Sequence, residues 1–154
     1  MLKELFMLIG FLFRKVEYGL EKLPIIQMKH FPFKWYSAMM WCCKLIDNER
    51  DNVNITDKIM NHEMIHYQQI CSIGSNIRYY LTYIWEWIKC GMIGNAAYYL
   101  NPLEIEAYVN ELNPNYKTYK GKYKLYKTEN GRKLYCEHRR EWKTFIREYF
   151  KDVL

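Results

Sequence analysis

Residues 56–72 read TDKIMNHEMIHYQQICS, and this stretch decides how the rest of the fold is interpreted. Thr56 is a favoured helix N-cap, because its hydroxyl can accept a hydrogen bond from a free backbone N–H in the first turn. Asp57 follows it, where a negative charge suits the positive end of the helix dipole. We therefore expect a helix that begins after Thr56 and runs to about Ser72, with Gly74 ending it.

Within this helix, His62-Glu63-Met64-Ile65-His66 has the spacing HExxH. Two histidines four residues apart lie on one helix face, so their ring nitrogens can hold one Zn²⁺ at about 2.0–2.1 Å. Glu63 follows the first histidine, and its carboxylate can reach the open side of the metal without binding it. There it can take a proton from a water molecule whose pKa the zinc lowers to about 7. The motif therefore predicts a zinc-dependent hydrolase with Glu63 as the general base.

A catalytic zinc site normally has three protein ligands, so a third is expected further along the chain. Residues 101–108 (NPLEIEAY) have an Asn cap with proline at the first helical position, which places Glu104 on the first turn of a separate helix. Glu104 and Glu106 lie about 200° apart on such a helix, so only one can face the metal. We favour Glu104, with Glu106 as the alternative. A capping box of Asn101 and Glu104 would explain Glu104 without a metal.

HEMIHYQQ followed at a distance by PLEIEAY resembles the gluzincin metallopeptidases, in which a glutamate on a later helix completes HExxH. In particular it is similar to small bacterial single-domain forms with an HExxHxxQ helix and a P-x-E-x-E-A-Y segment. The resemblance covers roughly residues 30–112. It implies a Zn²⁺ cofactor, a peptide or protein substrate, and a metal held by His62, His66 and Glu104.

Many larger gluzincins present the third ligand as ExxAD, and the chain departs from this pattern at one position. The pattern places its glutamate at Glu104 and its alanine at Ala107, but Tyr108 stands where the family has aspartate. In the family, that aspartate supports a ligand histidine through a hydrogen bond. Asn110 and Glu111 are the candidates to supply the support here.

The resemblance also implies a short β-sheet whose edge strand lies beside the metal helix, a zincin-like arrangement. Residues 38–46 (AMMWCCKLI) would lie near that edge, where an extended peptide could add as a further strand. A plain core strand explains the same residues equally well.

Other polar residues are harder to assign. The candidates for stabilising an oxyanion are Tyr98, Tyr99, Tyr108 and His138. Gln68 and Gln69 extend the metal helix, and either can bond a backbone carbonyl or a substrate. His30 is interpreted as structural.

The remaining elements follow from hydrophobic spacing and turn signals. Helices are expected at residues 2–21 (ending near Gly19), 76–89, 101–113 and over a final segment around 142–150; extended segments at 25–28 and 33–46; a polar loop at 47–52; and a hairpin centred on Asn130-Gly131 within 124–135. The predicted fold is α+β: one mostly helical domain over residues 1–154, with a short sheet near the metal helix. Its metal-site core spans about residues 30–112, followed by a basic C-terminal segment at 115–154.

The formal charge of +6 is concentrated in that C-terminal segment. Residues 115–154 carry 12 Lys/Arg against 5 Asp/Glu, a net of +7, whereas residues 1–114 carry 11 against 12, a net of −1. A basic segment with interleaved tyrosines can bind nucleic acid or an anionic membrane, but a solvated surface explains it more simply. Two rivals to the hydrolase therefore remain: a non-catalytic zinc-binding protein, and a binding protein that acts through its basic segment.

The cysteines and the N-terminal residues carry the information that the sequence gives on cellular location. The five cysteines are odd in number and contain no CxxC pair, so free thiols in the cytoplasm are expected. Residues 5–13 (LFMLIGFLF) are apolar, but a membrane span needs about 20 such residues. Arg14 and Lys15 follow directly, without a signal-peptide cleavage site. We expect no transmembrane helix, and peripheral membrane contact through the first helix stays open.

Overall fold

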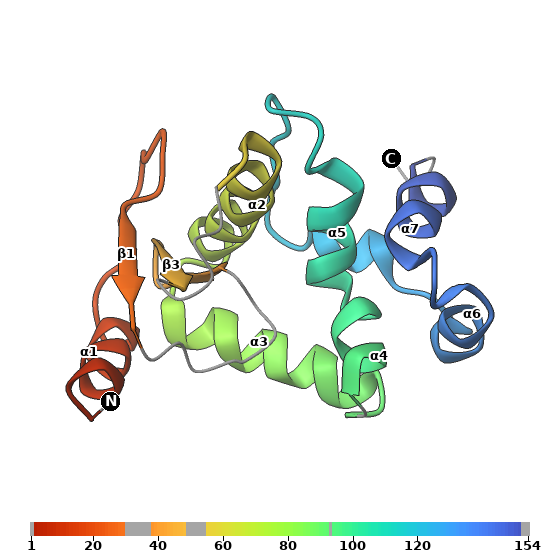
Figure 1. Ribbon diagram of the computed structural model, residues 1–154, viewed down its shortest axis with the longest axis horizontal. Helices are drawn as coiled ribbons and strands as arrows, with labels where there is room; N and C mark the ends of the chain where they lie inside the picture. Colours follow the sequence, from red (N-terminus) through yellow and green to blue (C-terminus); the bar gives the residue numbers. More distant parts are fainter. Residues whose placement is uncertain (1, 30–37, 49–54, 93, 152–154) are drawn as a thin grey trace.

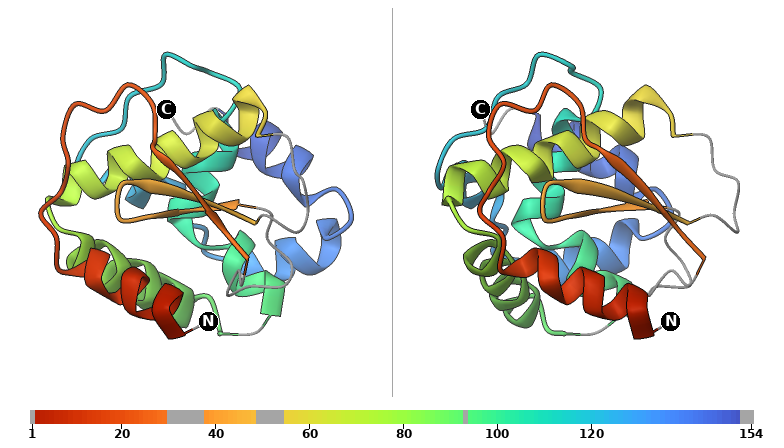
Figure 2. Two further views of the ribbon diagram at one scale, coloured as in Figure 1. Left: turned by 60° about the vertical axis from the view of Figure 1, so that its left-hand side comes forward. Right: turned by 90° about the vertical axis from the view of Figure 1, so that its left-hand side faces the viewer.

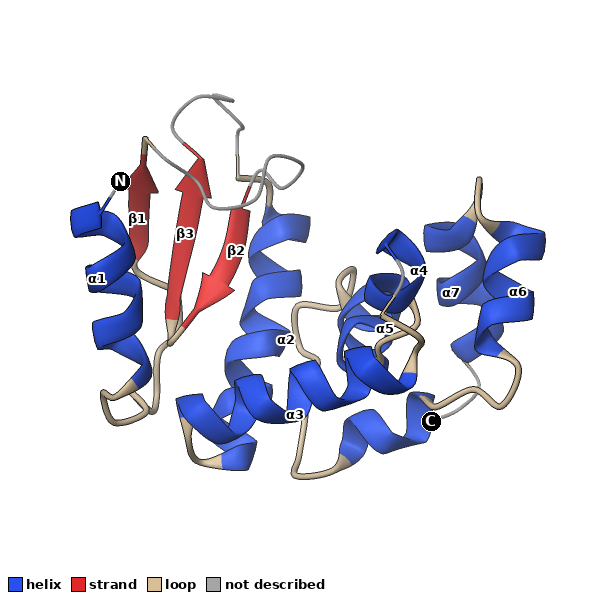
Figure 3. Ribbon diagram, turned by 90° about the horizontal axis from the view of Figure 1, so that it is seen from below, coloured by secondary structure: helices blue, strands red, loops and turns tan. Residues whose placement is uncertain are grey.

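The computed structural model describes residues 2–29, 38–48, 55–92 and 94–151. Within them, three short strands form a mixed sheet early in the chain. β1 (Ile25–Met28) pairs parallel with β3 (Lys44–Asn48), and β2 (Ala38–Trp41) pairs antiparallel with β3, giving the order β1-β3-β2. β2 is therefore an edge strand, and it lies beside helix α2 (Asp57–Ile73), as Figure 3 shows.

Helices make up most of the described chain. Besides α2 they are α1 (Leu2–Leu12), α3 (Asn76–Lys89), α4 (Gly94–Tyr99), α5 (Pro102–Asn110), the 3-10 helix η1 (Lys122–Tyr126), α6 (Gly131–His138) and α7 (Trp142–Phe150). The predicted mostly helical chain with a short sheet is confirmed.

The helix that carries the motif has the predicted ends. The Thr56 hydroxyl accepts a hydrogen bond from the N–H of Ile59, as an N-cap should. Gly74 ends the helix in the left-handed conformation, with φ of 80°, and its N–H bonds the Ile70 carbonyl. The bounds of α3 also match the prediction.

Several other predicted bounds were wrong. α1 ends at Leu12 and not near Gly19; the Asn76 side chain donates to the carbonyl of Phe11, in the last turn, and to that of Arg14, just beyond it. β3 continues through Asp47 and Asn48, which were expected in a loop; residues 49–52 of that loop lie outside the described part. α5 ends at Asn110 and not at Asn113, and α4 was not predicted. His30 and residues 33–37 also lie outside the described residues.

The hairpin prediction was wrong, and the chain places its tight turn elsewhere. Asn130 has a φ of −115° and Gly131 begins α6, so this dipeptide has no hairpin geometry. A Cβ on Gly131 would lie 2.7 Å from the Thr128 hydroxyl, so close approach explains this glycine. The two-residue turn instead joins β2 to β3 at Cys42 and Cys43, whose φ values of 50° and 65° fit a type I′ hairpin.

Two buried apolar clusters meet at α5. The first lies between the sheet, α2 and α3, and includes Leu45, Ile70 and Leu103. The second lies between α5, η1 and α7, and includes Ile105 and Ile146. The basic C-terminal segment therefore folds against α5, on the right in Figure 1, and contributes to the core. Among the described residues, no helix combines the length and the apolar character that a membrane crossing requires.

Candidate metal centre

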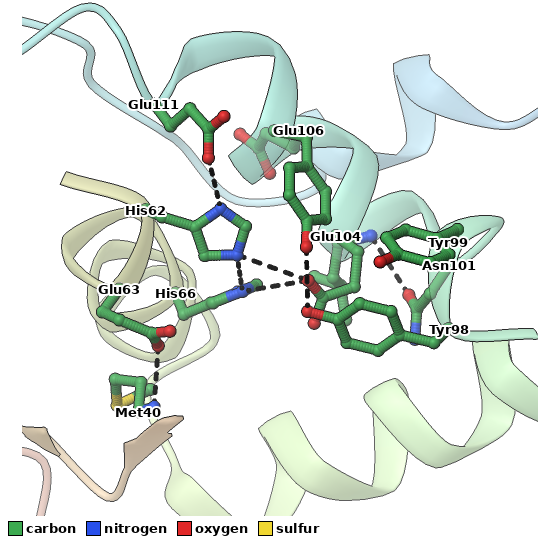
Figure 4. A network of polar contacts seen from close by, with 12 residues as sticks. Met40, His62, Glu63, His66, Tyr98, Tyr99, Asn101, Glu104, Glu106 and Glu111 are labelled. Atoms are coloured by element: carbon green, nitrogen blue, oxygen red, sulfur yellow. Dashed lines mark hydrogen bonds and ion pairs between the residues drawn. The ribbon is translucent and has the colours of Figure 1, made fainter. Parts of the chain in front are cut away.

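α2 and α5 bring two imidazoles and one carboxylate to the same point. The Nε2 atoms of His62 and His66 lie 3.2 Å apart. Glu104 Oε2 is 3.4 Å from Nε2 of His62 and 3.5 Å from Nε2 of His66. Figure 4 shows the three side chains converging from the two helices. The structure thus groups the three residues that the sequence suggested as ligands.

The spacing of these three atoms fits a tetrahedral zinc ion. Donors about 2.0–2.1 Å from an ion, at tetrahedral angles, are about 3.3–3.4 Å from one another. The three separations in the structure, 3.2, 3.4 and 3.5 Å, lie close to that value. Glu104 Oε2 is also buried without a hydrogen-bond partner, which is costly for a carboxylate oxygen. A cation bound by all three atoms would satisfy it, so the residues fit the metal.

The capping-box explanation of Glu104 does not hold in the structure. The Asn101 side chain caps α5 by accepting from the N–H of Leu103, whereas the backbone N–H of Asn101 bonds the Tyr98 carbonyl. Glu104 is left to point toward α2, and its Oε1 accepts a hydrogen bond of 2.8 Å from the Tyr83 hydroxyl. Its orientation is therefore set by α3 and the histidines.

Glu106, the alternative ligand, faces away from the histidines. It is fully buried, and its Oε1 accepts hydrogen bonds from the hydroxyls of Tyr116 and Thr118. Its Oε2 accepts a bond of 2.8 Å from Gln69 Nε2. The carboxylate of Glu106 is thus fully occupied in a hydrogen-bond network behind the candidate site.

His62 is held from behind by a carboxylate, as ligand histidines usually are. Its Nδ1 lies 3.1 Å from Glu111 Oε2, and Arg147 and Lys58 form ion pairs with Glu111 Oε1. This leaves Nε2 of His62 to face the centre. Of the two residues suggested for this support, Glu111 contacts the histidine. Asn110 instead bonds the Glu106 carbonyl and the Tyr126 hydroxyl.

His66 is held by an amide in place of a carboxylate. Its Nδ1 lies 2.9 Å from Gln69 Oε1 and 3.2 Å from the Tyr79 hydroxyl. Gln69 Nε2 donates to the Leu103 carbonyl and to Glu106, which fixes its oxygen toward the histidine. Gln68 Nε2 donates to the Tyr116 carbonyl. Both glutamines therefore bond backbone carbonyls, one of the two roles expected for them.

The two histidines and the carboxylates that contact them favour each other's charged forms. Burial opposes the protonation of His62, but the nearby carboxylates of Glu104 and Glu111 outweigh it and raise the pKa of His62 to about 10. The pKa of His66 is also raised, because the charge of Glu104 outweighs burial. Burial disfavours the Glu104 carboxylate, yet the two histidines hold its pKa well below the usual range. The cluster is thus electrostatically suited to pair a buried carboxylate with positive charge.

Glu63 lies beside the histidines and takes no part in their contacts. Burial raises its pKa, against the opposing effect of His62 and His66. Its Oε2 accepts a hydrogen bond of 2.7 Å from the N–H of Met40, on edge strand β2. The Met40 carbonyl accepts from the Tyr80 hydroxyl at 3.3 Å. A peptide that adds along β2 at Met40 would therefore have to displace both contacts.

A cavity of about 490 Å³ reaches His62 and Glu63 from the surface. Tyr98, Tyr99 and Tyr108 line it, so three of the four oxyanion candidates border this space. Tyr108, which replaces the family aspartate, packs edge-on against His62 with ring centroids 4.6 Å apart. The fourth candidate, His138, is stacked on Phe145 with ring centroids 4.1 Å apart and does not line the cavity.

Sequence reasoning missed Tyr79 and Tyr83, which contact His66 and Glu104 from α3. Their spacing of four places them on one helix face, but fifteen tyrosines in the chain hide such a signal. Gln69 was considered only as a partner for a carbonyl or a substrate, although its spacing of three from His66 also permits support of that histidine.

Comparison of the chain with protein-family models, with curated proteins and with solved structures found no match.

Proposed function

We propose that this chain is a zinc-dependent hydrolase, specifically a metallopeptidase that cleaves a peptide bond. The observation that carries the proposal is the metal-like spacing of the donor atoms of His62, His66 and Glu104, next to a carboxylate that is not one of them. Support for the histidines by Glu111 and Gln69 adds to it, because such partners fix the ring orientation that a metal needs.

Glu63 and three tyrosines at the cavity have catalytic roles in this proposal. A zinc ion, when bound, supplies a Lewis acid for the scissile carbonyl and a water molecule that is acidic enough to act near neutral pH. Glu63 accepts a proton from that water and returns it to the leaving amine. Tyr98, Tyr99 and Tyr108 are the side chains that can donate to a developing oxyanion, because they border the same cavity.

The proposal extends to the family and the architecture. HExxH on α2 and a glutamate on the separate helix α5 match the gluzincin pattern, and β2 beside α2 matches a zincin-like arrangement. Glu111 takes over the part that an aspartate plays in ExxAD gluzincins, since Tyr108 occupies that position. Zinc is the proposed cofactor and a peptide or protein the proposed substrate.

Metal analysis of the purified protein tests the zinc site. We expect one zinc per chain in the wild type and in Glu63→Gln, and loss of zinc in His62→Ala. His138→Ala is the matched control, because its ring stacks on Phe145 outside the cavity and should leave zinc in place. Freshly purified wild type without zinc, or zinc retained in His62→Ala, would overturn the proposed site.

Hydrolysis of a peptide library separates catalysis from metal binding. Wild type should cleave peptides, and Glu63→Gln should lower kcat by about 10²–10⁴-fold while keeping its zinc. Zinc binding without cleavage would favour the non-catalytic zinc-binding alternative. Cleavage that survives Glu63→Gln would exclude Glu63 as the base.

A further inference from the structure

Helix α1 is apolar on both of its faces. Leu8 and Phe11 point inward and are buried, with Leu8 packed against Met28 and Ile46. The outward side carries a second set at spacing i, i+3, i+4, i+7 and i+11, namely Leu2, Leu5, Phe6, Ile9 and, just after the helix, Phe13. Phe6 is 67% exposed and Phe13 75%. A surface helix normally presents polar residues outward, whereas this stripe is apolar and exposed in the described part of the chain, as contact surfaces are.

Helix α3 carries a stripe of the same kind. Its inward face buries Asn76, Tyr79 and Glu86. Its outward residues at i, i+4, i+7, i+8 and i+11 are Ile77, Leu81, Ile84, Trp85 and Ile88, and all five are exposed. Trp85 is 59% exposed, which is unusual for the largest apolar side chain.

The two stripes belong to neighbouring helices. Asn76, at the start of α3, donates to the Arg14 carbonyl at 3.0 Å and to the Phe11 carbonyl at 3.5 Å, which joins it to the end of α1. Figure 2 shows the end of α1 close to the start of α3, and Figure 3 shows that the two helices run in different directions from there. We call these two outward stripes together the α1–α3 face.

Basic residues accompany the α1–α3 face. Lys3, Arg14, Lys15 and Arg78 are exposed, and Lys89 pairs with Glu86, which is buried. Residues 2–15 and 76–89 together hold five basic residues and two acidic ones, Glu4 and Glu86, a net of +3. An apolar stripe flanked by Lys and Arg, with Trp and Phe among its side chains, is the composition that favours the surface of an anionic bilayer.

We propose that the α1–α3 face docks on a lipid bilayer that contains anionic lipids, with both helices lying in the plane of the interface. α1 has 11 residues and α3 has 14, whereas a span needs about 20, so neither helix can cross. A second copy of the chain is a poorer occupant, because a two-fold contact would bring the same basic residues against one another. Anionic head groups instead complement them.

Vesicle co-sedimentation of the full chain tests the proposal. The protein should bind vesicles of phosphatidylcholine with phosphatidylglycerol more tightly than vesicles of phosphatidylcholine alone. Phe6→Ser with Trp85→Ser should weaken binding by at least about tenfold, because two large apolar groups no longer enter the interface. Leu112→Ser with Tyr149→Ser is the matched control: these residues are 65% and 53% exposed but lie outside the face.

Two further measurements locate the contact. Lys3→Glu with Lys15→Glu should weaken binding to the anionic vesicles, whereas Lys120→Glu with Lys124→Glu, in the basic C-terminal segment, should have little effect. Trp fluorescence should shift to shorter wavelength on binding in wild type, and this shift should shrink in Trp85→Phe. Circular dichroism and thermal unfolding check that each variant is folded.

Three results would overturn the proposal. One is no binding to either kind of vesicle. Another is binding that the Lys120 and Lys124 variants abolish and the Phe6 and Trp85 variants leave intact, which would assign the contact to the basic segment. The third is a dimer in sedimentation analysis that Phe6→Ser with Trp85→Ser dissociates, which would make a second copy the occupant.

Discussion

We call the place where His62 and His66 of α2 meet Glu104 of α5 the α2–α5 junction. The junction and the α1–α3 face both reverse the usual placement of polar and apolar residues. At the junction, histidines and glutamates are buried; on the face, Phe6, Phe13 and Trp85 are exposed. Both arrangements cost free energy unless a partner is supplied. Most of the buried polar atoms at the junction have protein partners, and Glu104 Oε2 is the one at its centre that lacks a hydrogen bond. Within the part of the chain that the structure describes, both stripes of the face are exposed, and we propose a bilayer as their partner.

The largest effect should come from the ligand glutamate at the junction. Glu104→Gln removes the carboxylate charge that lies within 3.5 Å of both Nε2 atoms, and it should weaken zinc affinity by more than about 100-fold, beyond what loss of a supporting residue costs. Competition with a chelator of known affinity measures it. Glu106→Gln is the matched control on the same helix, since its carboxylate faces Tyr116 and Thr118. Equal losses in the two variants would contradict the assignment of Glu104.

A smaller loss of zinc affinity is expected at Glu111. Its carboxylate lies 3.1 Å from His62 Nδ1 and should fix the ring, so Glu111→Gln should weaken zinc binding by about 10–100-fold. Chelator competition again measures the change. Asn110→Ala is the neighbouring control, because Asn110 bonds Glu106 and Tyr126 and does not touch His62. An unchanged affinity in Glu111→Gln would show that His62 is oriented without it.

The spacing of residues within one helix predicts that His62 and His66 face the same point. It predicts little about the side chains that contact them from other elements. HExxH on a capped helix is set by contacts within one element, so His62 and His66 could be expected to converge. Glu104 required the relative placement of two helices, for which only the Asn-Pro start signal and a resemblance offered guidance. Tyr79, Tyr83 and Gln69 could not be assigned to the site, because tertiary packing selects them from many similar residues.

The turns also show that local sequence signals predict only part of the fold. Asn130-Gly131 has the dipeptide that favours a hairpin, yet Gly131 serves close packing against Thr128 and Leu100 at the start of α6. Cys42-Cys43 has no such signal, and the pairing of β2 with β3 imposes positive φ on both residues. Residues that favour such a turn by themselves are absent from this dipeptide, so the turn can be located only from the pairing of the two strands.

Glu106 lies behind the junction, so its substitution should change the stability of the fold and not the zinc affinity. Glu106→Gln keeps the shape of the buried side chain but removes a charge that three donors contact, Tyr116, Thr118 and Gln69. The free energy of unfolding should fall by about 1–3 kcal/mol, with zinc affinity little altered. Chemical denaturation of the zinc-free protein measures it. Thr118→Val, which removes one of those donors, should cost less, and a larger loss in Thr118→Val would contradict this ranking.

The smallest effect on stability is expected for substitutions on the α1–α3 face, because its apolar side chains are exposed whereas the polar groups of the junction are buried. Phe6→Ala removes a large side chain that is 67% exposed, so the free energy of unfolding should change by no more than about 0.5 kcal/mol. Leu8→Ala, two residues along the same helix, removes a side chain packed against Met28 and Ile46 and should cost about 2–5 kcal/mol. Thermal and denaturant unfolding of both variants measure the difference. If Phe6→Ala proved as costly as Leu8→Ala, the outward stripe would be part of the core, and its exposure could no longer be attributed to an external partner.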